Sequence, residues 1–569
     1  SSATGQLCCE RFLAFLERLL SCERISCRVL ATEVAVASLE RSGQLARRGA
    51  EEARGELVKK LLLALTRRCT DAVPSVRSRA LGGVGTAVQF LAKGGNSLKL
   101  LRRIALEPCD PQHADLSGMF RAAAKDEKPM VRKAALAFFD AVTVVLRDPL
   151  GLDDESLTGF FDLNALVRLS ADESIIVRKA CVSSLALLLR TSSLPRVCEL
   201  WVRNVLPLVL DVENTVAERA LDELEAAVLT PLSEGSDGLP LVLAQLDSEA
   251  TEYLQRGLQQ LAKRHEGLPR PFIAALARGV EECLNRPTHE WPLAVWAMLE
   301  EVTSIDPEAV SFELVFKAWT LFNAGLANGA VAVGQLGTKI LRSLEHLVSA
   351  ASQEHMDELL ESVCGALASL AAPASLIRAM MSTVERVEET WKAKKLYAKH
   401  SQERAAWRAS FLNSIQVMLS NYVRVELKDG AAQPQQLCSA LFSLGELALM
   451  DISIISRGII TQVQTVATNT IWRNGERVDT DPAVRGQAFA TLGKFCLRKD
   501  VLAKKSMELL VLHLNPNESF VVRNNVLIVL GDLCIHYTSL VDRFVPCMTG
   551  LLQDSNELLR KQAAMTLAA

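Results

Sequence analysis

Basic and aromatic side chains alternate in residues 391–408, and this combination suits the binding of phosphate groups. The segment carries six cations against one acid, Glu403, and three aromatic rings lie between them. On a helix the rings can turn inward while the lysines project outward, which predicts a cationic strip that contacts the DNA backbone without reading bases. The candidate DNA contacts are Lys392, Lys394, Lys395, Lys399, Arg404 and Arg408.

Two other interpretations of this strip remain open. It can be a solvated helix face whose charge is offset by Glu385, Glu388 and Glu389, or it can bind an acidic protein. A weaker basic cluster lies nearer the start of the chain, and nucleic-acid binding is its less favoured interpretation. This cluster consists of Arg54, Lys59, Lys60, Arg67 and Arg68.

The sequence lacks the common motifs for catalysis, nucleotide binding and metal binding. It contains no His-Glu-x-x-His, no Gly-x-Ser-x-Gly and no Gly-x4-Gly-Lys-[Ser/Thr]. Gly493 and Lys494 approach the last pattern, but Phe495 replaces the hydroxyl residue. His355 and Glu358 can share a helix face, yet no third metal ligand is apparent. We therefore expect no catalytic residue, no cofactor, no metal and no small-molecule substrate.

The composition of the 569 residues favours helices, because Leu, Ala and Val dominate and aromatic residues make up only 5%. The formal net charge of −3 argues against a uniformly basic surface, so any DNA contact must be local. No apolar run reaches the roughly 18 residues of a membrane-spanning helix, and we expect no membrane partner. The 14 Cys include no Cys-x-x-Cys pair, which predicts reduced thiols in the cytosol or nucleus.

A repeated pattern predicts the elements that position these residues. An acidic residue is followed five residues later by an apolar residue and six residues later by Arg. After each Arg, apolar and small residues recur at helical spacing. Near the two ends of the sequence successive copies lie between 37 and 55 residues apart, which is typical of two-helix HEAT units, and no copy is found between about residues 240 and 430. The repeated residues are Asp71 and Arg77, Asp126 and Arg132, Asp172 and Arg178, Asp479 and Arg485, Arg523 after Asn517, and Asp554 and Arg560.

We interpret these repeated pairs as a structural ladder. Each Asp precedes the second helix of its unit, where its side chain can cap free N–H groups. Each Arg lies in the first helical turn and can reach the Asp of the adjacent repeat. Because their periodicity follows the fold, these Arg residues are poor candidates for DNA contacts.

The pattern predicts one continuous all-α solenoid of HEAT repeats, with roughly fourteen units of about 40 residues. Three stretches differ in how clearly they show it. Residues 1–235 hold the N-terminal repeats, 236–430 hold degenerate helical repeats, and 431–569 hold the best-spaced copies. Since the sequence begins without Met and ends inside a periodic helix, we expect a piece of a longer protein, and no targeting segment can be read from it.

The C-terminal repeats resemble a known family. Residues 485–499, 503–514 and above all 522–544, followed by 552–563, are similar to the D-type HEAT subunits of condensin. The Leu-Gly-Glu-Leu of residues 444–447 resembles the unit that precedes them. The likeness is closer to the condensin II form than to the condensin I form, and elsewhere the chain resembles HEAT repeats in general.

The resemblance implies a non-catalytic regulatory subunit of condensin II that takes part in mitotic chromosome condensation. The implied partners are the kleisin subunit, the SMC ATPase heterodimer, the second HEAT subunit of the complex and double-stranded DNA or chromatin. ATP hydrolysis and loop formation would belong to the SMC subunits, and this subunit would regulate them. The implied location is the nucleus and mitotic chromosomes.

Two polar residues of the best-matched repeat are candidate partner contacts. Asn524 and Asn525 lie near a helix start on the side away from the expected core, where they can donate to the backbone of an extended peptide. Local capping or ordinary polar surface is the alternative.

Two other functional classes stay open. A HEAT-repeat scaffold for nuclear transport or phosphatase assembly would share the solenoid, although it would not be expected to carry the 522–544 run. An enzyme with scattered catalytic residues is the third class, and polar groups clustered in a closed pocket would indicate it.

Overall fold

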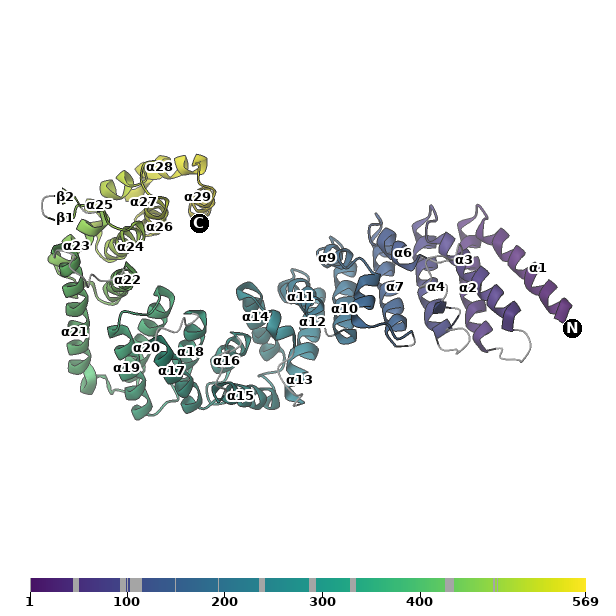
Figure 1. The fold of residues 1–569 in the computed structure, drawn as a ribbon, viewed down its shortest axis with the longest axis horizontal. Coiled ribbons are helices and arrows are strands. Elements are labelled where there is room, and N and C mark those ends of the chain that lie inside the picture. The colour runs from purple at the N-terminus through teal and green to yellow at the C-terminus, as the bar shows by residue number, and fades with distance from the viewer. Residues whose placement is uncertain are drawn as a thin grey trace. The chain divides into compact units, whose positions relative to one another are not determined.

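The computed structural model consists of paired helices, and Figure 1 shows their order along the chain. The residues that the structure describes are 2–44, 51–92, 99, 101–102, 115–148, 150–192, 194–234, 241–285, 293–327, 334–424, 434–473, 476–477 and 479–568. Contacts divide the chain into two units, Ser1–Glu301 and Val302–Ala569, called unit 1 and unit 2 below.

Unit 1 has two layers of helices. One layer is formed by α2 (Ile25–Gln44), α4 (Pro74–Ala92), α7 (Pro129–Arg147), α10 (Ile175–Thr191) and α12 (Asn214–Leu224), each in contact with the next. The other layer comprises α1 (Ser2–Leu20), α3 (Glu51–Arg68), α6 (Leu116–Ala123), α8 (Asp154–Phe160), α9 (Asn164–Ser170) and α11 (Pro195–Asn204). The unit continues through η1 (Leu206–Leu210), η2 (Glu225–Leu229), α13 (Thr230–Ser233), η3 (Leu241–Gln245), α14 (Ser248–Arg264) and α15 (Arg270–Leu284). The division between the two units, after Glu301, falls within α16 (Leu293–Ile305).

Unit 2 repeats this arrangement. Its first layer contains α18 (Gly334–Leu347), α20 (Ala374–Ala393), α22 (Pro434–Met450), α24 (Pro482–Arg498), α26 (Phe520–His536) and α29 (Glu557–Ala568), again in successive contact. Its second layer contains α17 (Phe312–Ala327), α19 (Gln353–Ala368), α21 (Tyr397–Arg424), α23 (Arg457–Ala467) and α25 (Asp500–Leu512). Shorter elements are η4 (Ile452–Ile454), α27 (Thr538–Val541), η5 (Asp542–Phe544), α28 (Val545–Gly550) and η6 (Leu551–Gln553).

The predicted all-α solenoid of HEAT repeats is confirmed. Among the described residues the departure is one antiparallel pair of two-residue strands, β1 (Trp472–Arg473) and β2 (Glu476–Arg477), with Trp472 opposite Arg477. None of the described helices is long and apolar enough to span a membrane. The stretches 1–235, 236–430 and 431–569 were predicted from the repeat pattern, whereas the two units are defined by contacts between residues. The three stretches therefore remain a prediction.

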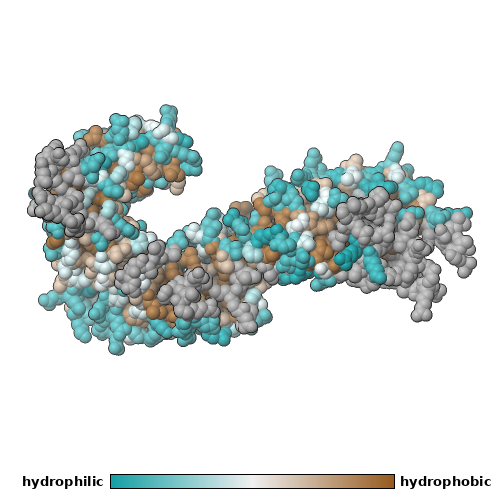
Figure 2. Space-filling view, viewed as in Figure 1, coloured by the Kyte–Doolittle hydropathy of each residue, from teal (hydrophilic) through white to brown (hydrophobic). Residues whose placement is uncertain are grey.

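The core follows from the helical spacing of apolar residues. In α7, Val131, Ala135 and Phe139 recur every four residues on one face and are at most 1% exposed. The Phe139 ring lies 5.3 Å from the ring centre of Phe120 and 4.8 Å from that of Phe161. Each repeat thus buries its apolar face against its neighbours, while hydrophilic side chains gather along the outer edges of the units (Figure 2).

Small residues lie where neighbouring helices of the same layer, such as α24 and α26, cross each other closely. A Cβ added to Gly493 of α24 would lie 2.6 Å from Val529 Cγ2 of α26, which is too close for an atomic contact. Gly531 is in the same position against Thr566 of α29. In α7 this position holds Asp140 instead, and burial raises the pKa of its carboxyl to about 6.

Candidate interaction surfaces and the ladder between repeats

The predicted cationic strip lies at the turn from α20 to α21. Four of its cations are exposed there: Lys392, Lys394, Lys395 and Lys399. Lys392 Nζ lies 5.0 Å from the ring centre of Tyr397, and Lys394 Nζ donates to the carbonyl oxygen of Ala351 at 3.1 Å. These lysines present a positive surface that can follow a phosphate backbone.

Lys395 has a backbone conformation that usually belongs to glycine, with φ of 60°. Its N–H donates to the carbonyl oxygen of Lys392, and the N–H of Leu396 donates to that of Trp391. These two bonds close the C-terminal end of α20 in a Schellman motif, whose left-handed position favours glycine. A lysine there costs on the order of 1 kcal/mol relative to glycine.

The DNA-contact prediction is wrong for Arg404 and Arg408, because both guanidinium groups turn into unit 2. Arg404 is 6% exposed, and its Nε donates to Glu388 Oε1 at 3.1 Å. Arg408 donates to the other carboxylate oxygen of Glu388. Glu388 is itself buried in α20, so the two arginines balance an interior charge.

The weaker basic cluster is partly structural. Arg68 Nη1 donates to the carbonyl oxygen of Leu20 at 3.1 Å and lies 3.3 Å from Asp71 Oδ2. The side chains of Arg54 and Lys59 lie outside the described residues. The cluster therefore offers less free charge than its sequence suggests.

The repeated Arg and Asp residues join neighbouring repeats. Arg132 Nε and Nη2 donate to the two carboxylate oxygens of Asp172 at 2.6 and 2.7 Å. Arg132 Nη1 donates to the carbonyl oxygens of Asp126 and Glu127 in the turn before its own helix. One guanidinium thus fastens two turns, with the bidentate geometry that Arg makes with carboxylates. The rungs of this kind are Arg77 with Asp126, Arg132 with Asp172 and Arg178 with Asp211.

The predicted helix-capping role of these Asp residues needs correction. Asp126 Oδ1 accepts from the N–H of Lys128, two residues on, and α7 begins only at Pro129. The carboxylate therefore stabilises the turn before the helix. Burial alone would raise the pKa of Asp126 and of Asp172, but bonds from Arg and backbone N–H groups outweigh it, and both pKa values lie below the ordinary value.

In unit 2 a glutamate supplies one rung. Arg485 Nη1 and Nη2 donate to the two oxygens of Glu518, both at 2.8 Å, and His513 Nδ1 also lies 2.8 Å from Glu518 Oε2. Glu518 directly follows Asn517, which occupies the expected Asp position. Burial opposes ionisation, but Arg485, His513 and the Ser519 N–H lower the pKa of Glu518 to about 2.

The remaining ladder residues differ from one another. Arg523 pairs with Asp554, as the other rungs do. Arg560 Nη1 donates to the carbonyl oxygen of Asp554 at 2.7 Å. The ladder prediction is wrong for Asp479, whose Oδ1 accepts from Asn469 Nδ2 at 2.9 Å.

One further rung lies outside the repeated sequence pattern. Arg28 Nε lies 3.0 Å from Asp71 Oδ2, and Arg28 Nη1 donates to the carbonyl oxygens of Cys22 and Glu23. These carbonyls precede Arg28 by six and five residues, as in the rungs of Arg77, Arg132 and Arg178. Cys22 takes the place of the expected Asp, so a search that allows any residue there would have found this copy.

The two candidate partner contacts of α26 are half-buried. Asn525 Nδ2 donates to the carbonyl oxygen of Val521 at 2.9 Å, one turn earlier in the same helix. This bond fits the local alternative for Asn525. The contact of Asn524 and Asn525 with a partner peptide remains a prediction.

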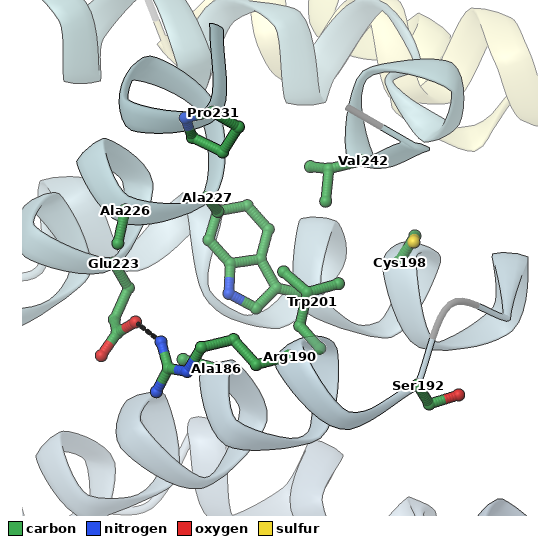
Figure 3. Close-up of a pocket in the computed structure, with 11 residues that line it drawn as sticks. Ala186, Arg190, Ser192, Cys198, Trp201, Glu223, Ala226, Ala227, Pro231 and Val242 are labelled. Carbon is green, nitrogen blue, oxygen red and sulfur yellow. Dashed lines mark hydrogen bonds and ion pairs between the residues drawn. The ribbon is translucent and has the colours of Figure 1, made fainter. Parts of the chain in front are cut away.

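A small cavity of about 240 Å³ lies in unit 1 around the indole of Trp201 (Figure 3). The ion pair between Arg190 and Glu223, at 2.8 Å, closes one side. Cys198 also lines the cavity, but burial raises the pKa of its thiol, which disfavours the nucleophilic thiolate. No group of three His, Cys, Asp or Glu in the described part of the chain is placed to hold a metal ion.

Two family descriptions match the C-terminal repeats. Residues 434–514 match the HEAT repeats described as condensin-2 complex subunit D3-like. Residues 521–569 match the description non-SMC mitotic condensation complex subunit 1. The two matches cover α22 to α29 and include the rungs of Arg485 and Arg523.

Similar proteins extend the likeness over most of the chain. It is 23% identical over 643 aligned positions to condensin-2 complex subunit D3-L of Xenopus laevis, covering 98% of this chain and 41% of that protein. It is 24% identical to condensin-2 complex subunit D3 of Mus musculus, covering 79% and 30%. The chain therefore spans less than half the length of these relatives.

A solved structure shares the fold. The C-terminal fragment of the cohesin loader SCC2 from Chaetomium thermophilum superposes with a TM-score of 0.60 and 15% identity. The superposition covers 91% of this chain and 38% of that one.

Proposed function

We propose that this chain, which belongs to the condensin-2 subunit D3-type family of HEAT-repeat proteins, is a non-catalytic regulatory subunit that binds both the condensin II kleisin and DNA. Through the kleisin it joins the SMC ATPase heterodimer and the second HEAT subunit. There it regulates ATPase-driven loop formation during mitotic chromosome condensation. Its proposed location is the nucleus and mitotic chromosomes.

The solenoid supports the kleisin part of the proposal. HEAT repeats contact only their neighbours, which leaves long continuous faces for an extended peptide. The match to D3-like subunits favours this role over transport or phosphatase scaffolding. Co-elution of the purified chain with the condensin II kleisin tests this part.

The exposed lysines at the α20–α21 turn carry the DNA part. These lysines would contact the phosphates of DNA and would not read its bases, so DNA binding should be independent of base sequence and sensitive to salt. Lys395 adds an exposed charge to this strip at a position where glycine would be more stable.

Charge reversal tests the DNA part directly. Replacing Lys392, Lys394, Lys395 and Lys399 by Glu should weaken duplex-DNA binding and make the slope of log affinity against log salt shallower by about 3.6 if each lysine contacts one phosphate. The control reverses four exposed lysines of unit 1 and changes the net charge equally: Lys125, Lys128, Lys133 and Lys179. Equal salt slopes for the two variants would contradict the assignment.

Lys395→Gly separates charge from folding. Glycine suits the left-handed conformation, so this variant should be more stable by about 1 kcal/mol while its DNA affinity falls. Thermal melting and fluorescence anisotropy with duplex DNA measure the two effects. A more stable variant with unchanged DNA affinity would remove Lys395 from the strip.

A further inference from the structure

A groove in unit 2 is lined by carboxylates from one face of α19. Glu354, Asp357, Glu358 and Glu361 follow the spacing that aligns side chains along a helix, and Glu403 of α21 adds a fifth carboxylate. The groove has a volume of about 1080 Å³. We call it the acidic groove.

The cationic side chain that lines the described part of the acidic groove is already paired with another residue. Arg404 is the single Lys or Arg among the described residues that line it. Its guanidinium pairs with Glu388 at 3.1 Å, so it leaves the charge of the five carboxylates in place. A ligand that fills this groove should therefore be cationic.

Two buried donors that line the acidic groove have hydrogen atoms to spare. Trp391 is 2% exposed, and its Nε1 has no acceptor among the described residues. Arg404 is 6% exposed, and although its Nε and Nη1 are bonded, its Nη2 has no acceptor among them either. A buried donor without an acceptor costs about 1–3 kcal/mol, so a ligand carrying carbonyl oxygens would gain from meeting both.

Aromatic contacts hold Trp391 and Arg404 in place along one wall of the acidic groove. The Trp391 ring stacks on His400 with 4.2 Å between ring centres, and His400 Nε2 lies 3.2 Å from Gln353 Nε2 of α19. The guanidinium carbon of Arg404 lies 4.5 Å from the ring centre of Trp407. A wall fixed in this way loses little conformational entropy on binding.

We propose that the acidic groove binds an extended peptide rich in Lys and Arg. The carboxylates of α19 and Glu403 pair with its basic side chains, while its backbone carbonyl oxygens accept from Trp391 Nε1 and Arg404 Nη2. A peptide supplies both kinds of group. DNA does not fit, because the carboxylates repel its phosphates.

This surface goes beyond the proposed function. It lies on other residues than the exposed lysine strip, so the proposed DNA contacts do not depend on it. The carboxylates lie in a row along α19 and do not converge as metal ligands do, which favours an extended polycation over a single metal ion.

The test measures peptide binding to the whole chain by fluorescence anisotropy. α19 has 16 residues and is about 24 Å long, which an extended peptide of about eight residues spans. The probe is a labelled eight-residue peptide that alternates Lys or Arg with Ser, and its counterpart carries Glu in place of every basic residue. We expect the basic peptide to bind, more weakly as salt rises, and the acidic one not to bind.

Charge reversal on α19 locates the binding. Glu354→Lys with Glu358→Lys should weaken binding of the basic peptide at least about tenfold. The matched control is Glu249→Lys with Glu252→Lys, which reverses two exposed acids at the start of α14, where Glu249 is the second helical residue as Glu354 is in α19. Equal affinity of the two double variants would overturn the proposal, and so would equal binding of the acidic and basic peptides.

Trp391→Phe tests the buried donor separately. It keeps an aromatic ring on His400 but removes the Nε1 hydrogen, so peptide affinity should fall several-fold. Circular dichroism and duplex-DNA affinity report whether the α20–α21 turn is intact. Full peptide affinity in a folded variant would remove Trp391 from the binding surface.

Discussion

Single arginines of the ladder fasten two turns at once. Arg132 bonds the carboxylate of Asp172 in the next repeat and backbone carbonyls in its own turn. This dual use explains why Arg recurs at one position, since lysine cannot make the bidentate contact and reach the carbonyls with one planar group. The ladder is a device of the fold, and it stays separate from the proposed DNA and peptide surfaces.

Truncation of a ladder arginine should destabilise unit 1. Arg132→Ala leaves the carboxylate of Asp172, 8% exposed, without its partner and should cost about 2–4 kcal/mol. Arg203→Ala breaks an exposed pair with Glu199 and should cost less than about 0.5 kcal/mol. Urea unfolding followed by circular dichroism measures both, and similar costs would contradict the ladder's structural role.

Glu518 predicts how stability depends on pH. Its pKa is about 2 in the folded chain, below the ordinary value of 4.5, so its ionised form stabilises the fold. This contribution, about 2–3 kcal/mol, is complete above pH 4.5 and is lost as the pH falls towards 2.

Glu518→Gln should therefore be less stable than the original chain at pH 7, and the gap should close between about pH 4.5 and 2. Urea unfolding at pH 7, 4.5 and 3 measures the difference. A gap that is constant across this range would show that the carboxylate charge does not stabilise the rung.

Charge counted along a sequence cannot show which way a side chain points. Arg404 and Arg408 were predicted as DNA contacts because they follow four lysines, but both reach back to Glu388 on the preceding helix. In one interpretation, Glu388 was among the acids that we expected to offset the positive charge of the strip. Its burial, which decides the matter, depends on the packing of α20 against its neighbours.

At the scale of elements, the repeated pattern predicted the second helices well. α7, α10, α24 and α29 begin at the turn that the repeated Asp marks, and α26 begins at the turn that Asn517 marks. Helical spacing and turn chemistry are local, so sequence reveals them. The acidic groove could not be predicted, because it brings α19 together with Trp391 and Arg404, up to fifty residues away along the chain.

Close crossing of helices predicts the effect of glycine substitutions. Gly493→Ala would press a methyl group into the Val529 side chain and should cost about 1–3 kcal/mol, despite the better helix propensity of Ala. Gly365 of α19 has open space around it, so Gly365→Ala should instead stabilise unit 2 by about 0.5–1 kcal/mol. Thermal melting compares the two, and a stabilising Gly493→Ala would contradict the crossing.

At the scale of the whole molecule, a nearly neutral chain concentrates opposite charges on neighbouring surfaces. The net charge of −3 excluded a basic coat, and the structure accordingly limits the proposed DNA contacts to the four exposed lysines near the α20–α21 turn. Composition and repeat period predicted the solenoid, because both follow from local helix formation. Partner choice depends on surfaces built by several repeats, so the sequence pointed to it only through family resemblance.

The central claim is that this chain is a condensin II subunit that binds the kleisin of that complex. Equilibrium affinity of the purified chain for the condensin II kleisin, with the condensin I kleisin as control, tests it most directly. We predict binding of the condensin II kleisin at least about tenfold tighter, equivalent to about 1.4 kcal/mol. A folded chain that binds neither kleisin, or binds the condensin I kleisin more tightly, would contradict the claim.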